Sequence, residues 1–304
     1  MPPPADARST ALMGVGLVVA AVTLFAVLDA AGKLLSEAHS VVQIVWARYM
    51  FAVPVLLAVV PAGSWPTLLR VRQPALQAGR ALMPVLASFA VVVGLGLLPL
   101  AEVTALTFAS PLVVVALAGP LLRERSSVHD WIGVVVGFLG ILVIVRPGAS
   151  AVAWAAVFPL ACAVCFALFQ LATRFVGRHD APVATLAWTI GVGLAVTTPL
   201  LLFDWRPVSG SAWAVMALSG LCFGGAQLLL IRAFRLAPAA VLTPFTYAQI
   251  VPAVLFGFVL FGAVPDLWAA VGTAILIGAG IYVVRRRVGA TGAPLPVSQL
   301  PPVA

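Results

Sequence analysis

Residues 98–111, LPLAEVTALTFASP, recur in outline 139 positions later as residues 237–250, APAAVLTPFTYAQI. The shared positions keep their order and a near-constant spacing, and the same spacing relates positions further along the chain. The matched pairs are Pro99 and Pro238, Ala101 and Ala240, Thr104 and Thr243, Gly133 and Gly272, and Arg146 and Arg285. With a small gap, Lys33 also aligns with Arg174. The sequence therefore predicts an internal duplication.

The composition predicts that this duplicated unit lies in a membrane. Of the 304 residues, 63% are hydrophobic and only 9% are charged, and the mean hydropathy is +1.15. Soluble domains carry about 25% charged residues, whereas apolar runs of about 20 residues are typical of transmembrane helices. Ten such segments are expected, at residues 11–35, 41–62, 80–98, 101–122, 128–146, 151–173, 182–203, 211–235, 238–262 and 266–284.

Together the repeat and the spans predict an all-α polytopic membrane protein, with ten transmembrane helices as two inverted five-helix repeats. The first repeat is expected at 11–148 and the second at 149–287, between disordered tails at 1–10 and 288–304 that are rich in Pro and Gly. Because each repeat has an odd number of spans, the second must enter the membrane from the opposite side. Inverted repeats are typical of secondary transporters, whose substrate site lies between the halves.

The basic residues predict the orientation. With the N-terminus inside, 13 of the 17 Lys and Arg fall in cytoplasmic segments, and only Arg146 and Arg206 fall outside. This bias follows the positive-inside rule. The chain is therefore expected in the inner membrane of the cell, with both termini in the cytoplasm. The net charge of +8 is thereby attributed to the membrane surface, and no nucleic-acid partner is expected.

Residues 105–148, ALTFASPLVVVALAGPLLRERSSVHDWIGVVVGFLGILVIVRPG, place a Pro within the fourth span, Glu124 in a short loop, and Trp131 and Gly133 before a fifth span with spaced glycines. This pattern resembles the EamA-type branch of the drug/metabolite transporter superfamily, whose members have ten helices in two repeats. The second half has the same design, except that Ala263 stands where the family usually has an acid. The opening FAVLDAAGKLL (25–35) and QIVWARY (43–49) look like members related to bacterial S-adenosylmethionine and riboflavin uptake carriers. The resemblance implies a transporter of a small organic metabolite working by alternating access.

Three charged residues lie unexpectedly within or near the first two spans. Asp29 and Lys33 are four residues apart and share one face of a helix. Lys33 can extend to the interface, but Asp29 is too short and too deep to do so. Arg48 in the second span is a candidate partner. Two interpretations remain: an ion pair that only orients the helices, or a pair that lines or gates the substrate path, with Asp29 as the group that takes up a proton.

Uncharged polar side chains add further candidates for this path. Gln170, Tyr247 and Gln249 lie deep in their spans, where they either line a central cavity or form hydrogen bonds between helices. Trp46 is a cavity candidate or an interfacial anchor. Two prolines, Pro111 and Pro252, are expected to kink their spans or to free backbone carbonyls towards a cavity. Small-residue faces such as that of Gly133 and Gly137 indicate close helix packing, with a moving or homodimer surface as the alternative.

No catalytic set, metal-ligand spacing or nucleotide-binding loop is visible in the sequence. The three cysteines fit packed helix interiors. The chain is therefore not expected to be an enzyme and no cofactor is expected. The predicted partners are a small-molecule substrate and the lipid bilayer, with a proton or a counter-substrate supplying the energy. The alternatives are a membrane-embedded enzyme acting on a lipid-linked substrate, and a non-transporting sensor or scaffold.

Overall fold

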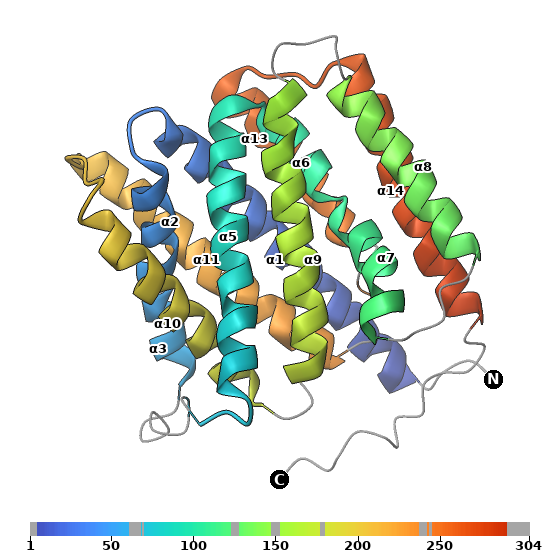
Figure 1. Cartoon of the computed structure of the whole chain (residues 1–304), viewed down its shortest axis with the longest axis horizontal. Helices are drawn as coiled ribbons and strands as arrows, with labels where there is room; N and C mark the ends of the chain where they lie inside the picture. The colour runs from blue at the N-terminus through green and yellow to red at the C-terminus, as the bar shows by residue number, and fades with distance from the viewer. Residues whose placement is uncertain are drawn as a thin grey trace.

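The computed structural model describes residues 5–60, 68, 70–122, 128–146, 153–176, 180–236, 242 and 245–290. These residues form an entirely helical bundle without strands (Figure 1). The elements are α1 (Ala5–Ser36), α2 (Val41–Met50), α3 (Val53–Val59), α5 (Pro74–Leu97), α6 (Leu100–Thr107), α7 (Ser110–Leu122), α8 (Val128–Val145), η1 (Ala153–Ala156), α9 (Val157–Val176), α10 (Pro182–Leu201), α11 (Gly210–Leu236), η2 (Tyr247–Gln249), α13 (Ile250–Phe261) and α14 (Leu267–Ala290).

Ten membrane-compatible units follow from these helices. Six, across the described residues, are long and apolar enough to cross a membrane, and four shorter apolar helices fall where the remaining predicted spans lie. Boundaries of three helices differ by six residues from the sequence prediction. Helix α14 continues to Ala290, past its predicted end at residue 284 and into the segment predicted to be a tail. Helix α1 begins at Ala5, inside the segment predicted to be a tail, because residues 5–13 contain no Pro or Gly to prevent helix formation. Helix α5 begins at Pro74 and not at residue 80, because Pro is favourable in the first turn.

Several spans are broken by proline at a defined distance. The ring of a proline clashes with the carbonyl group four residues earlier. Accordingly α2 ends at Met50, four residues before Pro54, and α6 ends at Thr107, four residues before Pro111. The residue four positions before Pro252 is Ala248, which lies in the 3-10 turn η2 (Tyr247–Gln249) that precedes α13. The break in the fourth span and the break in the ninth therefore have the same cause, which is what a duplicated unit requires.

The packing of the helices repeats the internal symmetry. The counterparts of α1, α5 and α8 in the second half are α9, α11 and α14. Helix α1 packs along α11, and α9 packs along α5, so each first helix lies against the third helix of the other half. The two fifth helices, α8 and α14, lie side by side at one edge of the bundle (Figure 1). The halves thus interlock as two inverted five-helix repeats.

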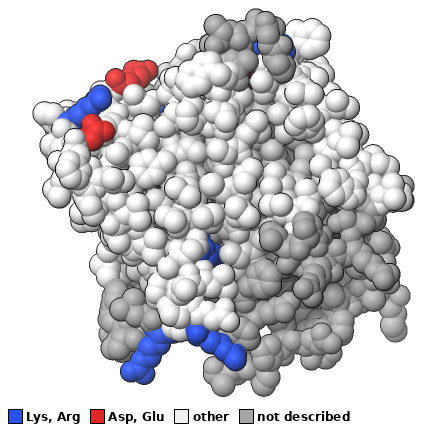
Figure 2. All heavy atoms as spheres, viewed as in Figure 1, with Lys and Arg blue, Asp and Glu red and all other residues white. Residues whose placement is uncertain are grey.

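The outer surface is that of a membrane protein. In Figure 2 the middle of the visible face is almost free of charge. Lys and Arg lie near its upper and lower ends, and Asp and Glu lie near its upper end. Large apolar side chains are exposed on the rim helices, among them Phe138 and Leu139 of α8 and Phe258 and Val259 of α13. A soluble protein rarely exposes so continuous an apolar surface, so the chain is a multi-pass membrane protein.

Facing glycines hold α8 against α14. A Cβ atom added to Gly272 would lie 2.6 Å from the carbonyl oxygen of Gly140, and one added to Gly140 would lie 2.9 Å from the carbonyl oxygen of Gly272. The two backbones therefore approach as closely as small residues permit. Gly220 and Gly224 of α11 play the same part against α2 and α3, where Phe51 and Val55 fill the space beside them.

We expect Gly272→Ala to destabilise the protein, because its methyl group would meet backbone atoms that cannot turn aside. Overpacking of this kind costs about 1–3 kcal/mol. Gly278→Ala on the same helix is the matched control, since no atom lies within 4 Å of its added Cβ. Thermal unfolding in detergent should show a lower midpoint for Gly272→Ala and an unchanged or higher one for Gly278→Ala. Equal midpoints for the two variants would contradict the glycine contact.

Candidate functional site

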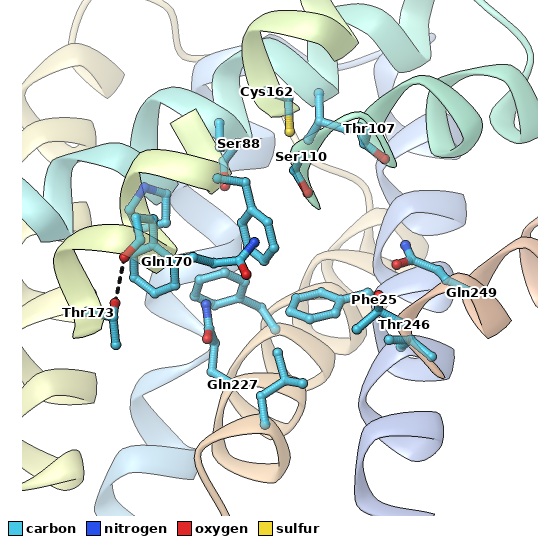
Figure 3. A pocket seen from close by; sticks show the side chains of 18 of the residues that line it. Phe25, Ser88, Thr107, Ser110, Cys162, Gln170, Thr173, Gln227, Thr246 and Gln249 are labelled. Carbon is cyan, nitrogen blue, oxygen red and sulfur yellow. Dashed lines mark hydrogen bonds between the residues drawn. The ribbon is translucent and has the colours of Figure 1, made fainter. Parts of the chain in front are cut away.

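A cavity of about 550 Å³ lies inside the bundle, between the two repeats (Figure 3). It is lined by helices of both halves, including the broken segments at Phe108 and Thr246. It does not extend evenly through the bundle. On α5 its lining residues run from Arg80 to Val91, and on α11 from Phe223 to Leu230. The cavity therefore extends from mid-depth towards the end of the bundle at which α1 begins and α14 ends.

An acid and a base meet in the cavity wall. The Asp29 carboxylate on α1 and the Arg48 guanidinium on α2 are 3.6 Å apart, and their side chains are 13% and 2% exposed. This separation is longer than a charge-assisted hydrogen bond, which is about 2.7–2.9 Å. The other carboxylate oxygen of Asp29 accepts a long hydrogen bond of 3.4 Å from Nε2 of Gln249. The pair is therefore held loosely, and it joins the first repeat to η2 of the second.

Local sequence brings Arg48 to this position. The guanidinium passes directly over Gly32 of α1, where a Cβ atom would lie 2.7 Å from Nη2. Any larger residue at that position would push the arginine away from Asp29. Atoms Nε and Nη2 of Arg48 are buried and have no hydrogen-bond partner among the described residues. Arg48 is thus a buried cation with two nitrogen donors that lack hydrogen-bond partners among the described residues.

A second buried arginine, Arg80, lines the part of the cavity nearest the start of α5, and each of its three guanidinium nitrogens donates a hydrogen bond. Its side chain packs over the ring of Phe169 of α9, 4.8 Å from the ring centroid. It donates to Oε1 of Gln77 (3.1 Å), Oγ1 of Thr173 (3.2 Å), the carbonyl of Thr185 (2.9 Å) and Oγ1 of Thr189 (2.7 Å). Gln77 in turn donates to the carboxylate of Asp180 at 2.8 Å. Arg80 thereby ties α5, α9 and α10 together.

Aromatic rings and amides make up much of the remaining wall. Phe166 and Phe169 of α9 stack with centroids 5.9 Å apart, and both line the cavity together with Phe25 of α1. The carboxamides of Gln170 and Gln227 point into the cavity (Figure 3). Neither carboxamide forms a hydrogen bond within the described part of the chain. The wall thus offers ring faces for stacking and unpaired amides for recognition.

Four of the seven candidate residues from the sequence line this cavity: Asp29, Arg48, Gln170 and Gln249. Lys33 does not, because its ammonium donates to the carbonyls of Leu95 and Leu98, at 2.8 Å each. Those carbonyls end helix α5, where backbone acceptors lack helical partners. Lys33 therefore closes the gap between α1 and α5 at the end of the bundle away from the cavity.

Trp46 and Tyr247 also lie outside the cavity lining. Trp46 packs edge-on against Trp205 and Trp213, with centroids 6.5 Å away in both cases. Tyr247 is 4% exposed and packs against the ring of Phe108 at 5.1 Å. Its hydroxyl fits over Gly280 of α14, where any side chain would collide with it. Both residues hold helices together in this conformation.

Polar contacts also hold helices together at the end of the bundle away from the cavity, here called the closed end. Ser40 donates to the carbonyl of Asp204 at 3.0 Å, and Nε2 of Gln43 donates to the carbonyl of Arg206 at 2.7 Å. An ion pair between Arg146 and Asp266 joins the loop after α8 to the start of α14. The backbone N–H of Ala269 and the Arg146 guanidinium hold the pKa of Asp266 below its ordinary value. This end is thus fastened by bonds that include both halves.

Sequence reasoning missed two parts of the cavity. Arg80 was assigned to a cytoplasmic segment, because the span was expected to begin at residue 80. Pro74 followed by an uninterrupted helical stretch is the signal that would have placed Arg80 inside the helix. Phe25 and Phe166 were not singled out, since a Phe in an apolar span carries no signal of its own. Only the fold reveals that they share one cavity.

The sequence matches the EamA-like transporter family over residues 12–146 and again over residues 153–286. The chain belongs to this family. The two matched segments correspond to the two five-helix repeats. The family match therefore covers nearly the whole bundle, and the cavity is lined by residues from both matched segments.

Individual relatives carry two kinds of name. The riboflavin transporter of Rhizobium johnstonii is 28% identical over 64% of this chain and 65% of its own length, and that of Vibrio cholerae is 29% identical over 59% and 60%. In both, the match spans less than two thirds of the relative. The S-adenosylmethionine uptake transporter of Rickettsia felis is 23% identical over 92% of this chain and 95% of its own length. A crystal structure with 19% identity superposes on 92% of the chain with a TM-score of 0.62, which supports the fold.

We expect Lys33→Met to open the closed end, because it removes both hydrogen bonds to the end of α5. The native thiol of Cys162 lines the cavity and reports access to it. In a Cys165→Ala/Cys222→Ala background, a membrane-impermeant thiol reagent applied at the closed end should label Cys162 faster in Lys33→Met. Lys33→Arg retains the donors and should label like the parent. Identical labelling rates in all three proteins would show that Lys33 does not seal this end.

Proposed function

We propose that this chain is a secondary-active transporter that carries a small organic metabolite across the bacterial inner membrane by alternating access. The observation that carries the proposal is the cavity between two inverted repeats, with the Asp29–Arg48 pair in its wall. An ionisable group within a membrane span is costly and commonly marks a transport pathway. Membership of the EamA-like transporter family supports the same conclusion.

The unequal packing of symmetry-related helices supports alternating access. Helix α1 packs against α5, with Lys33 fastening them at one end. Their counterparts α9 and α11 do not pack closely against each other within their described residues. Because the two halves have the same design, exchanging these arrangements would open the closed end and close the other. The contacts that alternate are then α1 with α5 and α9 with α11.

The charge distribution supports an orientation with both termini in the cytoplasm. With Arg80 assigned to the interior of α5, 12 Lys and Arg remain in the segments on the side of the termini, and Arg146 and Arg206 remain on the other. That bias is still strong by the positive-inside rule. In this orientation the cavity extends towards the cytoplasm, and the end fastened by Lys33 and the Arg146–Asp266 pair faces outwards.

The relatives suggest flavins and S-adenosyl compounds as the first solutes to test. A gradient of protons or of a counter-substrate would drive the movement. Asp29 is the group suited to coupling, because its carboxyl is buried in the cavity wall and is only loosely held by Arg48 and Gln249. Taking up a proton would remove its attraction for Arg48, and that change could accompany the binding of a solute.

In proteoliposomes that contain only this chain, we expect gradient-driven flux of radiolabelled riboflavin or S-adenosylmethionine without ATP. Asp29→Asn is nearly isosteric and should fold normally but lose most of that flux, about tenfold or more, because the proton or counter-ion is no longer linked to Arg48. Asp204→Asn, in a loop at the closed end, is the control and should transport like the parent. A strict ATP requirement would refute the transport proposal. Parental rates for Asp29→Asn at every pH tested would show that the pair is architectural.

The orientation is tested by reporter fusions after residue 38 and after residue 287. The first should report the periplasm and the second the cytoplasm, because nine spans separate the two positions. A fusion after residue 206 serves as a second outward-facing position. If the reporters at residues 38 and 287 lie on the same side, the odd number of crossings between them is wrong. A cytoplasmic report at residue 38 with a periplasmic one at residue 287 would reverse the orientation.

A further inference from the structure

Two arginines in the cavity wall are equally buried but differ in what they bind. Arg48 and Arg80 are each 2% exposed. Arg80 donates four hydrogen bonds and stacks on a ring. Among the described residues, Arg48 has only the Asp29 carboxylate, at 3.6 Å, and its Nε and Nη2 atoms have no hydrogen-bond partner there. The nitrogens of Arg80 therefore all have partners within the fold, whereas two nitrogens of Arg48 have none among the described residues.

A buried arginine whose donors lack hydrogen-bond partners destabilises the protein unless a ligand supplies acceptors for them. A buried donor without an acceptor costs about 1–3 kcal/mol, and more when it is charged. A guanidinium presents its donors as a planar fork, which fits two oxygen atoms of one carboxylate or a neighbouring pair of carbonyl-type acceptors. Arg48 lines the cavity and is held loosely by Asp29, so a turn of its guanidinium would bring those buried donors to acceptors of a solute in the cavity.

We propose that Arg48 is the docking point for an oxygen acceptor of the transported solute, and that the cavity selects neutral or anionic ring compounds over cations. This inference rests on the proposed transport function and deepens it by naming the substrate class. The solute's oxygen binds the Arg48 guanidinium and competes with Asp29 for it. Its ring lies between Phe25 and the phenylalanines of α9.

The charges in the wall support this selection. Among the described lining residues, the charged groups are Asp29, Arg48 and Arg80, which gives a formal charge of +1. The only carboxylate lies beside Arg48, so a cation entering the cavity would have to take Asp29 from it and leave that arginine without a counter-charge. Removing one partner of a buried pair in this way is strongly unfavourable. An anion or a carbonyl group instead supplies Arg48 with an acceptor, and a displaced Asp29 is neutralised by the proton that it takes up.

The uncharged groups describe the remainder of the solute. Gln170 and Gln227 each offer one carbonyl acceptor and one amide donor group, and neither is paired in the described structure. Two such groups beside ring faces suit a planar compound with alternating acceptors and donors on its edge. Riboflavin has this character and is neutral, whereas S-adenosylmethionine carries a positively charged sulfonium. The wall therefore favours the first kind of solute.

Binding can be tested without identifying the natural solute. Benzoate, benzamide and benzamidinium share one ring and differ in charge. At millimolar concentration they should slow the modification of Cys162 by methyl methanethiosulfonate in the Cys165→Ala/Cys222→Ala protein. We expect protection in the order benzoate, benzamide, benzamidinium. Equal or better protection by benzamidinium, or no protection by either of the other two, would overturn the proposal.

Variants identify the docking group. Arg48→Gln should weaken benzoate protection about tenfold or more, because the fork and its charge are both lost. Arg48→Lys keeps the charge and should lose less, so it serves if the first variant fails to fold. Asp29→Asn removes the competitor and should strengthen benzoate protection. Arg206→Gln, an exposed loop arginine, is the control and should match the parent. A purely structural Arg48–Asp29 pair would make Asp29→Asn bind less, which would overturn the proposal.

A second matched pair of probes links the inference to the relatives. S-adenosylhomocysteine lacks only the methyl group and positive charge of S-adenosylmethionine. Thermal stabilisation of the purified protein should show tighter binding of S-adenosylhomocysteine, which has no sulfonium and no net charge. Tighter binding of S-adenosylmethionine would refute the selection by charge. These assays measure binding alone. Benzoate protection without flux in vesicles would refute transport and leave Arg48 as the docking point, whereas flux without any dependence on Arg48 would refute the docking point alone.

Discussion

The hydrocarbon interior of a membrane offers no hydrogen-bond partner, so each polar group there must find one within the protein. This constraint gives the few charges of the bundle their meaning. Lys33 completes the end of α5, and Arg80 completes a network of threonines and Gln77. Both are satisfied by the fold. Arg48 is not satisfied by the described residues, and it lines the cavity between the repeats. The site is therefore defined by the charge that the fold leaves incomplete.

Symmetry and its local failure determine the shape around that charge. Pro111 and Pro252 interrupt equivalent spans, and both interrupted segments border the cavity. Glycines at 140 and 272 meet across the seam of the two fifth helices. These features are shared by the halves and would survive an exchange of conformations. The contact between α1 and α5 is not shared, because α9 and α11 lack its equivalent in their described residues. The shared features form the framework, and the unshared contact is the part suited to change.

The sequence was sufficient for the spans but not for the directions of side chains. Hydropathy is a local property, so ten apolar runs could be read directly, and most described helix ends lie within a few residues of them. The start of the ninth run, at residue 238, lies outside the described residues. A helix that is apolar all round carries little signal about which face is buried. For that reason Gln170 and Tyr247 looked alike in sequence, although only Gln170 reaches the cavity. Arg80 was misplaced because a basic residue six positions inside a helix resembles one in the loop before it.

The duplication also explains why charge and amide lie opposite each other. The alignment of Lys33 with Arg174 uses an offset of 141 residues, and the same offset aligns Asp29 with Gln170. Both of these residues line the cavity, one from each half. The halves thus keep equivalent positions for the site but fill them differently, with an acid in one and a neutral amide in the other. In the proposed transport cycle, a solute held between them would contact a charged half and an uncharged half in either conformation. Asp29, in the charged half, is loosely held by Arg48 and Gln249, so a proton or a solute that alters this pair acts on α1, α2 and the second repeat together.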